Sequence, residues 1–292
     1  MIHALTIDVE DNHRIVARNL LGRDGPPTQA VVENTTRLLE HLRKRGVRAT
    51  FFALGEVAAT FPGLIRAISE DGHELGVHGY HHQEVHKLDV RAFRREVIDA
   101  KTLIEDTSGT RVRGHRAPTF SITPDTRWAL DVLAEAGFAY DSSIFPIRSR
   151  RYGWPGLPLD IHEMHLNGDR RIIEAPLSVV TILGKRLPAC GGGYLRHFPY
   201  RYTDWAMRRI QRTRPVIVYL HPYDIDTVPP PGWLQEALAA AGGPTKRYLA
   251  LQQRNRHTVE SKLLRLLESF RFAPLRDVIE QTIGSGPRGE PS

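Results

Sequence analysis

The chain has 292 residues, of which 41% are hydrophobic and 25% charged, and its 40 Lys and Arg against 33 Asp and Glu give a formal net charge of +7. This composition excludes disordered, collagen-like and multispan membrane proteins, and no run of about 18 apolar residues is present to cross a membrane. The single cysteine, Cys190, excludes an internal disulfide and a cysteine-rich zinc module.

The first residues contain neither the basic region nor the long apolar stretch of a signal peptide, so we expect a cytoplasmic protein. The positive charge is compatible with contact to an anionic membrane surface or an acidic substrate. Basic residues are mostly dispersed, and the densest cluster is interpreted as a solvated helix face: Arg208, Arg209, Arg212 and Arg214. Because no RNA-binding signature or zinc-finger spacing accompanies this cluster, we expect no nucleic-acid partner.

Apolar strands alternate with amphipathic helices along the first half of the chain. Residues 2–8 predict a buried strand, and residues 28–45 place apolar side chains at helical spacing before Gly46, a typical helix-ending residue. The elements that follow are a strand at 47–54, a helix at 61–71, a strand at 73–78, a helix at 90–105, a strand at 112–115, a helix at 123–136 and a strand at 138–140.

The second half keeps this alternation but is interrupted by a long irregular segment. Strands are predicted at 171–175 and 216–220, and helices at 202–213 and 259–270. The segment 145–193 is rich in Gly, Pro and Arg and predicts a long insertion over one rim of the sheet. We expect residues 1–283 to form one domain and residues 284–292 to be a disordered tail.

Repeated strand–helix alternation predicts a parallel sheet with crossover helices, which is an α/β fold. Closure of that sheet into a barrel would let one domain use almost the whole chain. In such barrels the catalytic groups lie at the carboxyl ends of the strands. The polar residues that follow each predicted strand are therefore the candidates for chemistry.

Three carboxylates, Asp8, Glu10 and Asp11, directly follow the first strand. Carboxylates this close repel one another unless a cation or a proton lies among them. The pattern therefore indicates a metal site or an acid–base site, and the alternative is an acidic loop that caps a later element.

Four histidines, His78, His81, His82 and His86, lie at the end of the strand at 73–78 and just after it. His78 and His82 are four residues apart, as are His82 and His86, so the spacing alone leaves the metal-ligating pair ambiguous. Together with a carboxylate from another strand end, one pair would form a two-histidine, one-carboxylate site with open positions that can activate water. Ordinary structural histidines are the alternative.

Further polar residues follow the later strands. Arg116, after the strand at 112–115, can orient a carboxylate, although alone it would be taken as a surface ion-pair residue. His221 ends the strand at 216–220 and can protonate a leaving amine, the alternative being a structural histidine.

In this order the motifs resemble those of the polysaccharide deacetylases with the NodB-homology fold, carbohydrate esterase family 4, over roughly residues 2–272. The matching segments are Leu5-Thr6-Ile7-Asp8, His78-Gly79-Tyr80-His81-His82, Arg116-Ala117-Pro118, Asp141 and Leu220-His221. The resemblance implies a distorted (β/α) barrel of about seven parallel strands. It also implies one divalent metal, with zinc expected first and cobalt, nickel or manganese as alternatives.

The resemblance also implies roles for individual residues. Asp8 is the catalytic base and Arg116 steadies it, while His221 is the general acid and Asp141 pairs with it. His78 and His82, rather than His86, hold the metal. Pro118, Tyr194 and Trp154 are expected to bind substrate, the two aromatic rings by stacking on sugars after the glycines at 191–193; the alternative is a loop that only covers the barrel.

Two departures from the family pattern concern the metal site. Val9 stands where a second aspartate is common, so the carboxylate ligand is Glu10 or Asp11; we favour Glu10, because alternate residues of an extended chain face the same side. Gly79 stands where many relatives have Ser or Thr, so a side-chain hydrogen bond to the loop is lost.

The chain is most similar to a subfamily found with exopolysaccharide and exosortase gene clusters, in the segments DVED, VRATFF, HGYHH, RGHRAPTFSIT, YDSSIFP and GGGY. The expected activity is metal-dependent removal of N-acetyl groups from amino sugars of a bacterial polysaccharide or its lipid-linked precursor, with a backbone N–H helping to stabilise the oxyanion. The alternatives are a deformylase, a cyclic-amide hydrolase similar to allantoinase, and a non-catalytic glycan-binding barrel. The intact set of Asp8, His78, His82 and His221 argues against the last.

Overall fold

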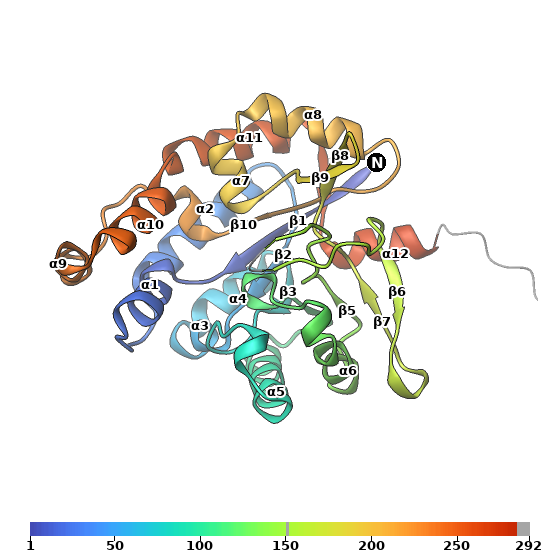
Figure 1. The fold of residues 1–292 in the computed structure, drawn as a ribbon, viewed down its shortest axis with the longest axis horizontal. Coiled ribbons are helices and arrows are strands. Elements are labelled where there is room, and N and C mark those ends of the chain that lie inside the picture. Colours follow the sequence, from blue (N-terminus) through green and yellow to red (C-terminus); the bar gives the residue numbers. More distant parts are fainter. Residues whose placement is uncertain (150–151, 285–292) are drawn as a thin grey trace, which may run out of the picture.

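A mostly parallel sheet forms the centre of the molecule in the computed structural model, which describes residues 1–149 and 152–284 (Figure 1). The first strand, β1 (Ile2–Val9), is buried along almost its whole length. It pairs in parallel with β10 (Ile217–Leu220) on one side. On the other side it pairs with β2 (Thr50–Ala53) near its carboxyl end and with the short β11 (Arg271–Ala273) near its start.

From β2 the sheet continues through β3 (Glu74–Val77), β4 (Gly114–His115), β5 (Tyr140–Asp141), β7 (Arg171–Glu174) and β6 (His162–His165). The seven strands along the path from β10 to β7 are parallel to their neighbours, and β6 is antiparallel to β7. The predicted α/β fold class with about seven parallel strands is confirmed.

No backbone ladder closes the ring between β6 and β10 in the described part of the chain. A side chain bridges this gap instead, because the Oγ of Ser178, which follows β7, accepts a hydrogen bond of 2.8 Å from the backbone N–H of Ile217. The barrel is therefore distorted, with an open seam between β10 at one edge of the sheet and the β7–β6 pair at the other.

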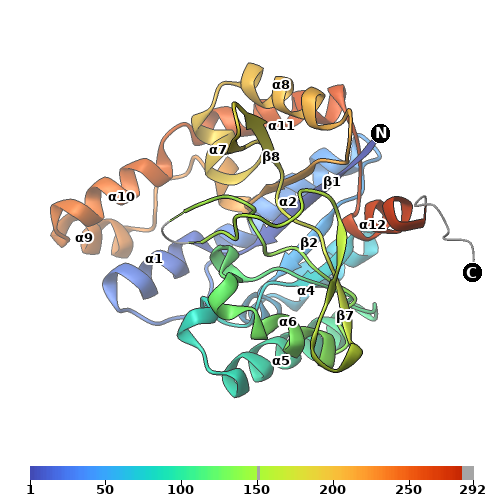
Figure 2. The ribbon, with the colours of Figure 1, turned by 45° about the vertical axis from the view of Figure 1, so that its right-hand side comes forward.

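Helices cover the outside of the sheet (Figures 1 and 2). In α2 (Gln29–Arg43) the apolar residues at helical spacing, Val31, Leu38, Leu39 and Leu42, are buried against the core. The other covering helices are α4 (Pro62–Glu70), α5 (Val90–Ser108), α6 (Trp128–Glu135), α8 (Tyr200–Ile210), α11 (Val259–Ser269) and α12 (Leu275–Gly284). Except for α12, these are the helices that the hydrophobic periodicity predicts.

Several short elements were not predicted. They include the strands β6 and β11 described above, α1 (Asn12–Leu21), α3 (Gly55–Thr60), α7 (Gly192–His197), α9 (Gly232–Ala240), α10 (Gly243–Gln253) and the hairpin of β8 (Val179–Ile182) and β9 (Lys185–Pro188). Figure 1 shows α9 and α10 beside α1 at one end of the molecule, away from α12. No helix among the described residues is both long enough and apolar enough to cross a membrane.

The segment 145–193 is more than an insertion over the rim. It carries β7, which belongs to the central sheet, and its antiparallel partner β6, as well as the separate β8–β9 hairpin. At the other end of the chain, Gly284 ends α12, and the rest of the tail expected to be disordered lies outside the described residues.

Candidate metal centre and pocket

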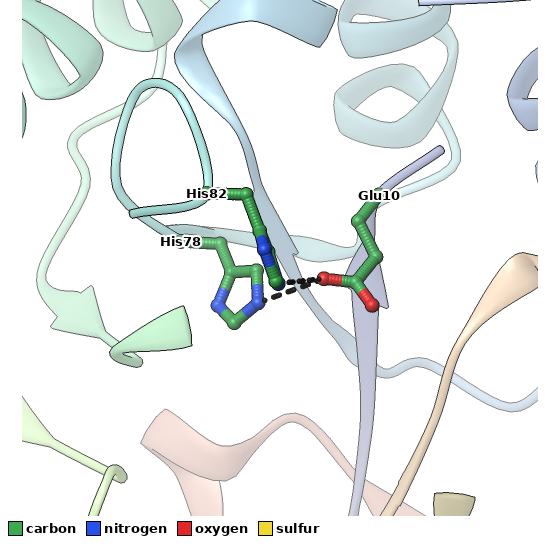
Figure 3. A group of neighbouring side chains, drawn as sticks. All are labelled: Glu10, His78 and His82. Carbon is green, nitrogen blue, oxygen red and sulfur yellow. Dashed lines mark hydrogen bonds and ion pairs between the residues drawn. The ribbon is translucent and has the colours of Figure 1, made fainter. Parts of the chain in front are cut away.

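Glu10, His78 and His82 meet at the carboxyl ends of β1 and β3 (Figure 3). One oxygen of Glu10, Oε2, lies 2.6 Å from His82 Nε2 and 3.3 Å from His78 Nε2. The three side chains each offer one ligand atom, and these atoms lie within 4.8 Å of one another. His86, by contrast, pairs with Glu84 on the surface. The structure thus brings His78 and His82, and not His86, to the carboxylate.

The hydrogen bonds around this group fit a metal site. His78 Nδ1 lies 2.8 Å from the backbone carbonyl oxygen of Arg116 and donates to it, so Nε2, which faces Glu10, is the nitrogen that can bind a metal. Burial would raise the pKa of Glu10, but the charges of His82 and His221 and the histidine hydrogen bonds outweigh it and hold the pKa well below its ordinary value. Two imidazole nitrogens and one ionised carboxylate are ligands that suit zinc and similar divalent ions.

Asp11, the other predicted carboxylate ligand, does not belong to this group. Its Oδ1 accepts hydrogen bonds from the backbone N–H of His13 and Arg14, and its Oδ2 accepts one from Thr28. Asp11 is therefore the N-cap of α1. The assignment of Asp11 as a ligand is wrong because both of its oxygens are used to satisfy backbone donors.

Asp8 lies beside the metal group and is held by a fully buried arginine. Arg116 Nη1 donates to Asp8 Oδ1 at 2.9 Å and to Thr6 Oγ1 at 2.7 Å. Its Nε and Nη2 donate to the backbone oxygen and the hydroxyl of Ser142, and the guanidinium lies over the ring of Phe52. This network fixes one oxygen of Asp8 and leaves Oδ2 on the side of His221.

His221 faces Asp8 and Glu10 from the end of β10. Its Nε2 lies 3.9 Å from Asp8 Oδ2 and 3.6 Å from Glu10 Oε1, while its Nδ1 lies 2.8 Å from Asp224 Oδ2. Burial alone would lower the pKa of His221, but the negative charges of Asp224, Glu10 and Asp8 raise it to about 9. The imidazole is therefore held as a proton donor directed at the space next to the metal group.

The partner of His221 is Asp224, so the predicted pairing with Asp141 is wrong. Adjacent strands β4 and β5 place His115 opposite Asp141, and His115 Nδ1 lies 2.7 Å from Asp141 Oδ1. The sequence does hold a signal for the correct partner. Pro222 starts a short 3₁₀ turn directly after His221, and such a turn brings residues i and i+3 together, which places Asp224 at the imidazole.

A pocket of about 440 Å³ opens above these residues and is lined by Asp8, Glu10, His78, His82 and His221. Its remaining wall is rich in aromatic side chains, namely Phe120, Tyr152, Tyr194, Tyr219, Tyr223 and Tyr248. A volume in this range suits a small ligand or one unit of a polymer. The aromatic wall and the central polar group together form one candidate active site.

Tyr194 reaches this pocket because glycines precede it. A Cβ added to Gly191 would lie 2.3 Å from the backbone oxygen of Tyr219, and one added to Gly192 would lie 2.5 Å from the Tyr219 ring. Gly191 and Gly192 also both have positive φ. The hydroxyl of Tyr194 lies 2.9 Å from that of Tyr152, so the ring is fixed at the pocket wall. Only glycine permits this close approach of the chain to β10.

The other two predicted substrate residues lie elsewhere among the described residues. Trp154 donates its backbone N–H to Phe145 and packs partly buried against the main core, away from the pocket lining. Pro118 packs next to Gly79, and its neighbours Thr119 and Phe120 line the pocket in its place. Trp154 and Pro118 therefore do not line this pocket, and their contact with a sugar stays a prediction.

Two family models match the chain in succession, one for polysaccharide deacetylases over residues 23–140 and one for a domain of unknown function, DUF3473, over residues 142–280. Residues 23–140 thus have the sequence pattern of the polysaccharide deacetylase family. The predicted resemblance is confirmed at this level. The likeness to the exopolysaccharide and exosortase subfamily stays a prediction.

Curated polysaccharide deacetylase relatives match only part of the chain. A peptidoglycan deacetylase-like protein of Gibberella zeae is 33% identical over 154 residues, which is 50% of this chain and 44% of that protein. A peptidoglycan-N-acetylglucosamine deacetylase of Bacillus cereus is 31% identical over 109 residues, 37% of this chain and 38% of that protein. The chain thus spans less than half the length of either relative.

Solved structures share the fold over nearly the whole chain. A probable polysaccharide deacetylase from Pseudomonas aeruginosa has a TM-score of 0.62 at 17% identity, covering 97% of this chain and 91% of that chain. An allantoinase has the same TM-score at 16% identity, covering 97% and 90%. At these identities the likeness supports the deacetylase-type (β/α) barrel and says nothing further about activity.

Proposed function

We propose that this protein is a metal-dependent N-deacetylase that removes acetyl groups from amino sugars of a bacterial polysaccharide or its precursor. The observation that carries the proposal is the position of Asp8 and His221, which face each other beside Glu10, His78 and His82 in one pocket. The names of the two curated relatives, a peptidoglycan deacetylase-like protein and a peptidoglycan-N-acetylglucosamine deacetylase, support an acetylated amino sugar as the substrate class.

Glu10, His78 and His82 would hold the ion, and zinc suits this donor set best, with cobalt, nickel and manganese as alternatives. A divalent metal at this position supplies Lewis-acid polarisation of the acetyl carbonyl and favours deprotonation of water. The protein contributes the rest of the chemistry through Asp8, His221 and the groups that orient them.

Asp8 acts as the general base. Arg116 keeps its carboxylate in place through Oδ1, so Oδ2 is the oxygen that accepts a proton from the attacking water. The water oxygen then bonds to the acetyl carbon. A positioned base of this kind contributes about 10²–10⁴ in rate.

His221 acts as the general acid. Its Nδ1 is engaged by Asp224, so the proton on Nε2 is the one directed into the pocket. When the C–N bond of the acetamide breaks, this proton passes to the nitrogen of the leaving amino sugar, and the other product is acetate. The ring lies flat on Tyr223, with 4.6 Å between centroids and 9° between planes, which fixes its orientation.

The shared fold keeps two other amide hydrolases as alternatives, a deformylase and a cyclic-amide hydrolase such as the allantoinase of the same fold. The discriminating experiment is to strip the protein of metal, reload it with Zn²⁺, Co²⁺, Ni²⁺ or Mn²⁺ and measure product release. Metal-dependent acetate release from N-acetylglucosamine oligomers or peptidoglycan fragments, lost in Asp8→Asn, supports the proposal. Faster formate release from N-formyl sugars, or faster ring opening of allantoin, would replace it. Glycan binding without any product would favour a non-catalytic barrel.

We further propose a cytoplasmic protein that takes a lipid-linked precursor at an anionic membrane surface. The end of the molecule formed by α1, α9 and α10 supports this, because it exposes apolar and basic side chains together: Leu20, Val228, Trp233, Tyr248, Leu251, Lys246, Arg247 and Arg254. Tyr248 also lines the pocket. Co-sedimentation with phosphatidylglycerol vesicles, reduced in Trp233→Ser and absent with phosphatidylcholine, tests the contact; equal binding to both lipids contradicts it.

A further inference from the structure

The loop that joins the two histidine ligands is held in an uncommon backbone conformation. Gly79 has φ of 77°, and His82 has φ of 54°, which is in the left-handed region that side chains disfavour. Residue 79 is glycine, so it offers no side chain to fix the loop. Contacts from other elements must therefore hold the loop if His78 and His82 are to present their nitrogens together.

Glu96, on α5, supplies the hydrogen-bond acceptor that this loop needs. Its Oε2 accepts hydrogen bonds from two successive backbone N–H groups, those of Tyr80 at 2.8 Å and His81 at 3.0 Å. The same oxygen would lie 3.9 Å from a Cβ added at Gly79, so it occupies the space beside the missing side chain. Phe93 and Val97 bury the adjoining positions of α5 in the core, which fixes where the carboxylate lies.

The carbonyl groups of the same loop are held from the opposite side. The backbone N–H of Gly55 donates to the oxygen of Gly79, and that of Glu56 donates to the oxygen of Tyr80, both at 3.0 Å. These bonds come from the start of α3 and depend on no side chain. Arg18 of α1 adds a hydrogen bond to the oxygen of His81. Glu96 is thus the side chain that fixes the N–H side of the loop.

We infer that Glu96 is a positioning residue of the metal centre: by holding Tyr80 and His81 through their N–H groups, it fixes the separation of His78 and His82 and so the affinity for the ion. The inference rests on the proposed metal site. Groups that orient metal ligands from outside the ligand set contribute about 10- to 100-fold in affinity. A carboxylate that only stabilised the fold would leave the affinity of the folded protein unchanged.

The test compares Glu96→Ala, Glu96→Gln and a control, Asp99→Ala. Asp99 is an exposed carboxylate of the same helix, and together with Glu96 it lines an open groove of about 840 Å³ outside the loop. The dissociation constant for Zn²⁺ is measured by chelator competition, ligand geometry by the visible absorption of bound Co²⁺, and stability by the melting temperature of the metal-free protein.

Glu96→Ala should bind Zn²⁺ about 10- to 100-fold more weakly, with an altered Co²⁺ spectrum. Glu96→Gln should stay close to wild type because the amide oxygen can accept both N–H groups, and Asp99→Ala should match wild type. Wild-type affinity and spectrum in Glu96→Ala would overturn the inference while leaving the proposed metal site intact. A glutamine variant as weak as the alanine variant would also overturn it, since acceptor geometry is the claim.

Two further results separate the inference from the proposed function. If wild type itself binds no divalent metal, the metal site of the proposed function fails and the inference fails with it. If Glu96→Ala does not fold, Glu96→Asp carries the test, because it keeps the charge but is one methylene too short to reach both N–H groups. Weaker Zn²⁺ binding in Glu96→Asp supports the inference, and unchanged binding overturns it.

Discussion

Two histidine–aspartate pairs in this protein have nearly the same geometry and opposite surroundings. His221 Nδ1 lies 2.8 Å from Asp224, and His115 Nδ1 lies 2.7 Å from Asp141. His221 lines the pocket, and its Nε2 faces two more carboxylates. His115 is 0% exposed, its Nε2 has no hydrogen-bond partner among the described residues, and aromatic rings surround it.

These surroundings, more than the shared aspartate contact, decide the charge of each imidazole. For His221 the surrounding carboxylates outweigh burial and raise the pKa to about 9. For His115 burial dominates, and the neighbouring His78 and Arg116 add to it, so the pKa is lowered despite Asp141. The His221 imidazole therefore keeps its proton, and the His115 imidazole is a neutral part of the core.

The largest effects should come from removing the two imidazoles. His221→Ala should lower kcat/KM by about 10²–10⁴ with metal content and melting temperature near wild type, because a proton donor is lost. His115→Ala should instead lower the free energy of unfolding by about 2–5 kcal/mol, because it opens a buried cavity beside Asp141. Steady-state kinetics, metal content and thermal unfolding on both variants test this. A stability loss in His221→Ala equal to that of His115→Ala would contradict the division of roles.

A smaller effect should separate the two aspartates. Asp224→Asn removes the charge that engages His221 Nδ1, so kcat should fall by at least about tenfold while metal stays bound. Asp141→Asn removes a core charge near Glu174, whose pKa burial and Asp141 raise well above its ordinary value, so its main effect should be on unfolding. Activity per folded molecule, with melting temperatures measured in parallel, checks both. If Asp141→Asn lowered kcat as much as Asp224→Asn, the rejected pairing would be restored.

A third histidine, the buried His73, sharpens the comparison because no carboxylate among the described residues forms a hydrogen bond with it. His73 Nδ1 accepts a hydrogen bond of 3.1 Å from the backbone N–H of Ala49, and burial, with only partial opposition from Asp71, lowers its pKa from 6.5 to about 4. Since the unfolded chain binds the proton more readily, His73 destabilises the fold as pH falls from 6.5 to 4. The free energy of unfolding falls by an amount on the order of 3 kcal/mol over this pH range.

His73→Asn tests this pH effect. The Asn amide oxygen can accept the same hydrogen bond without titrating, so the variant should lose less stability than wild type between pH 6.5 and 4. His257→Asn, at an exposed position, is the control and should follow wild type. Urea unfolding at several pH values gives the comparison. Parallel curves for His73→Asn and wild type would mean that His73 does not bind its proton differently in the two states.

Hydrophobic periodicity predicted the framework, because the strands and helices that cover the core repeat apolar residues over several turns. It missed α9 and α10, whose buried faces reduce to single residues such as Leu234 and Leu249, too few to form a periodic pattern. The site was predicted where motif residues sit at strand ends, as for Asp8 and His78. Asp141 was misassigned because strand register, which places it beside His115, depends on contacts between distant segments.

Arg116 connects Asp8, the proposed general base, to two strands of the barrel. Its guanidinium joins the interior of β1, through Thr6 and Asp8, to the chain after β5, through Ser142, so the proposed general base and the centre of the barrel share one cation. Replacing this arginine would leave a buried carboxylate unpaired, which is strongly destabilising. A protein engineer who wishes to change the rate or the substrate range therefore has little freedom at the base. The adjustable parts are the pocket wall, where Tyr152, Tyr194 and Tyr248 come from peripheral segments.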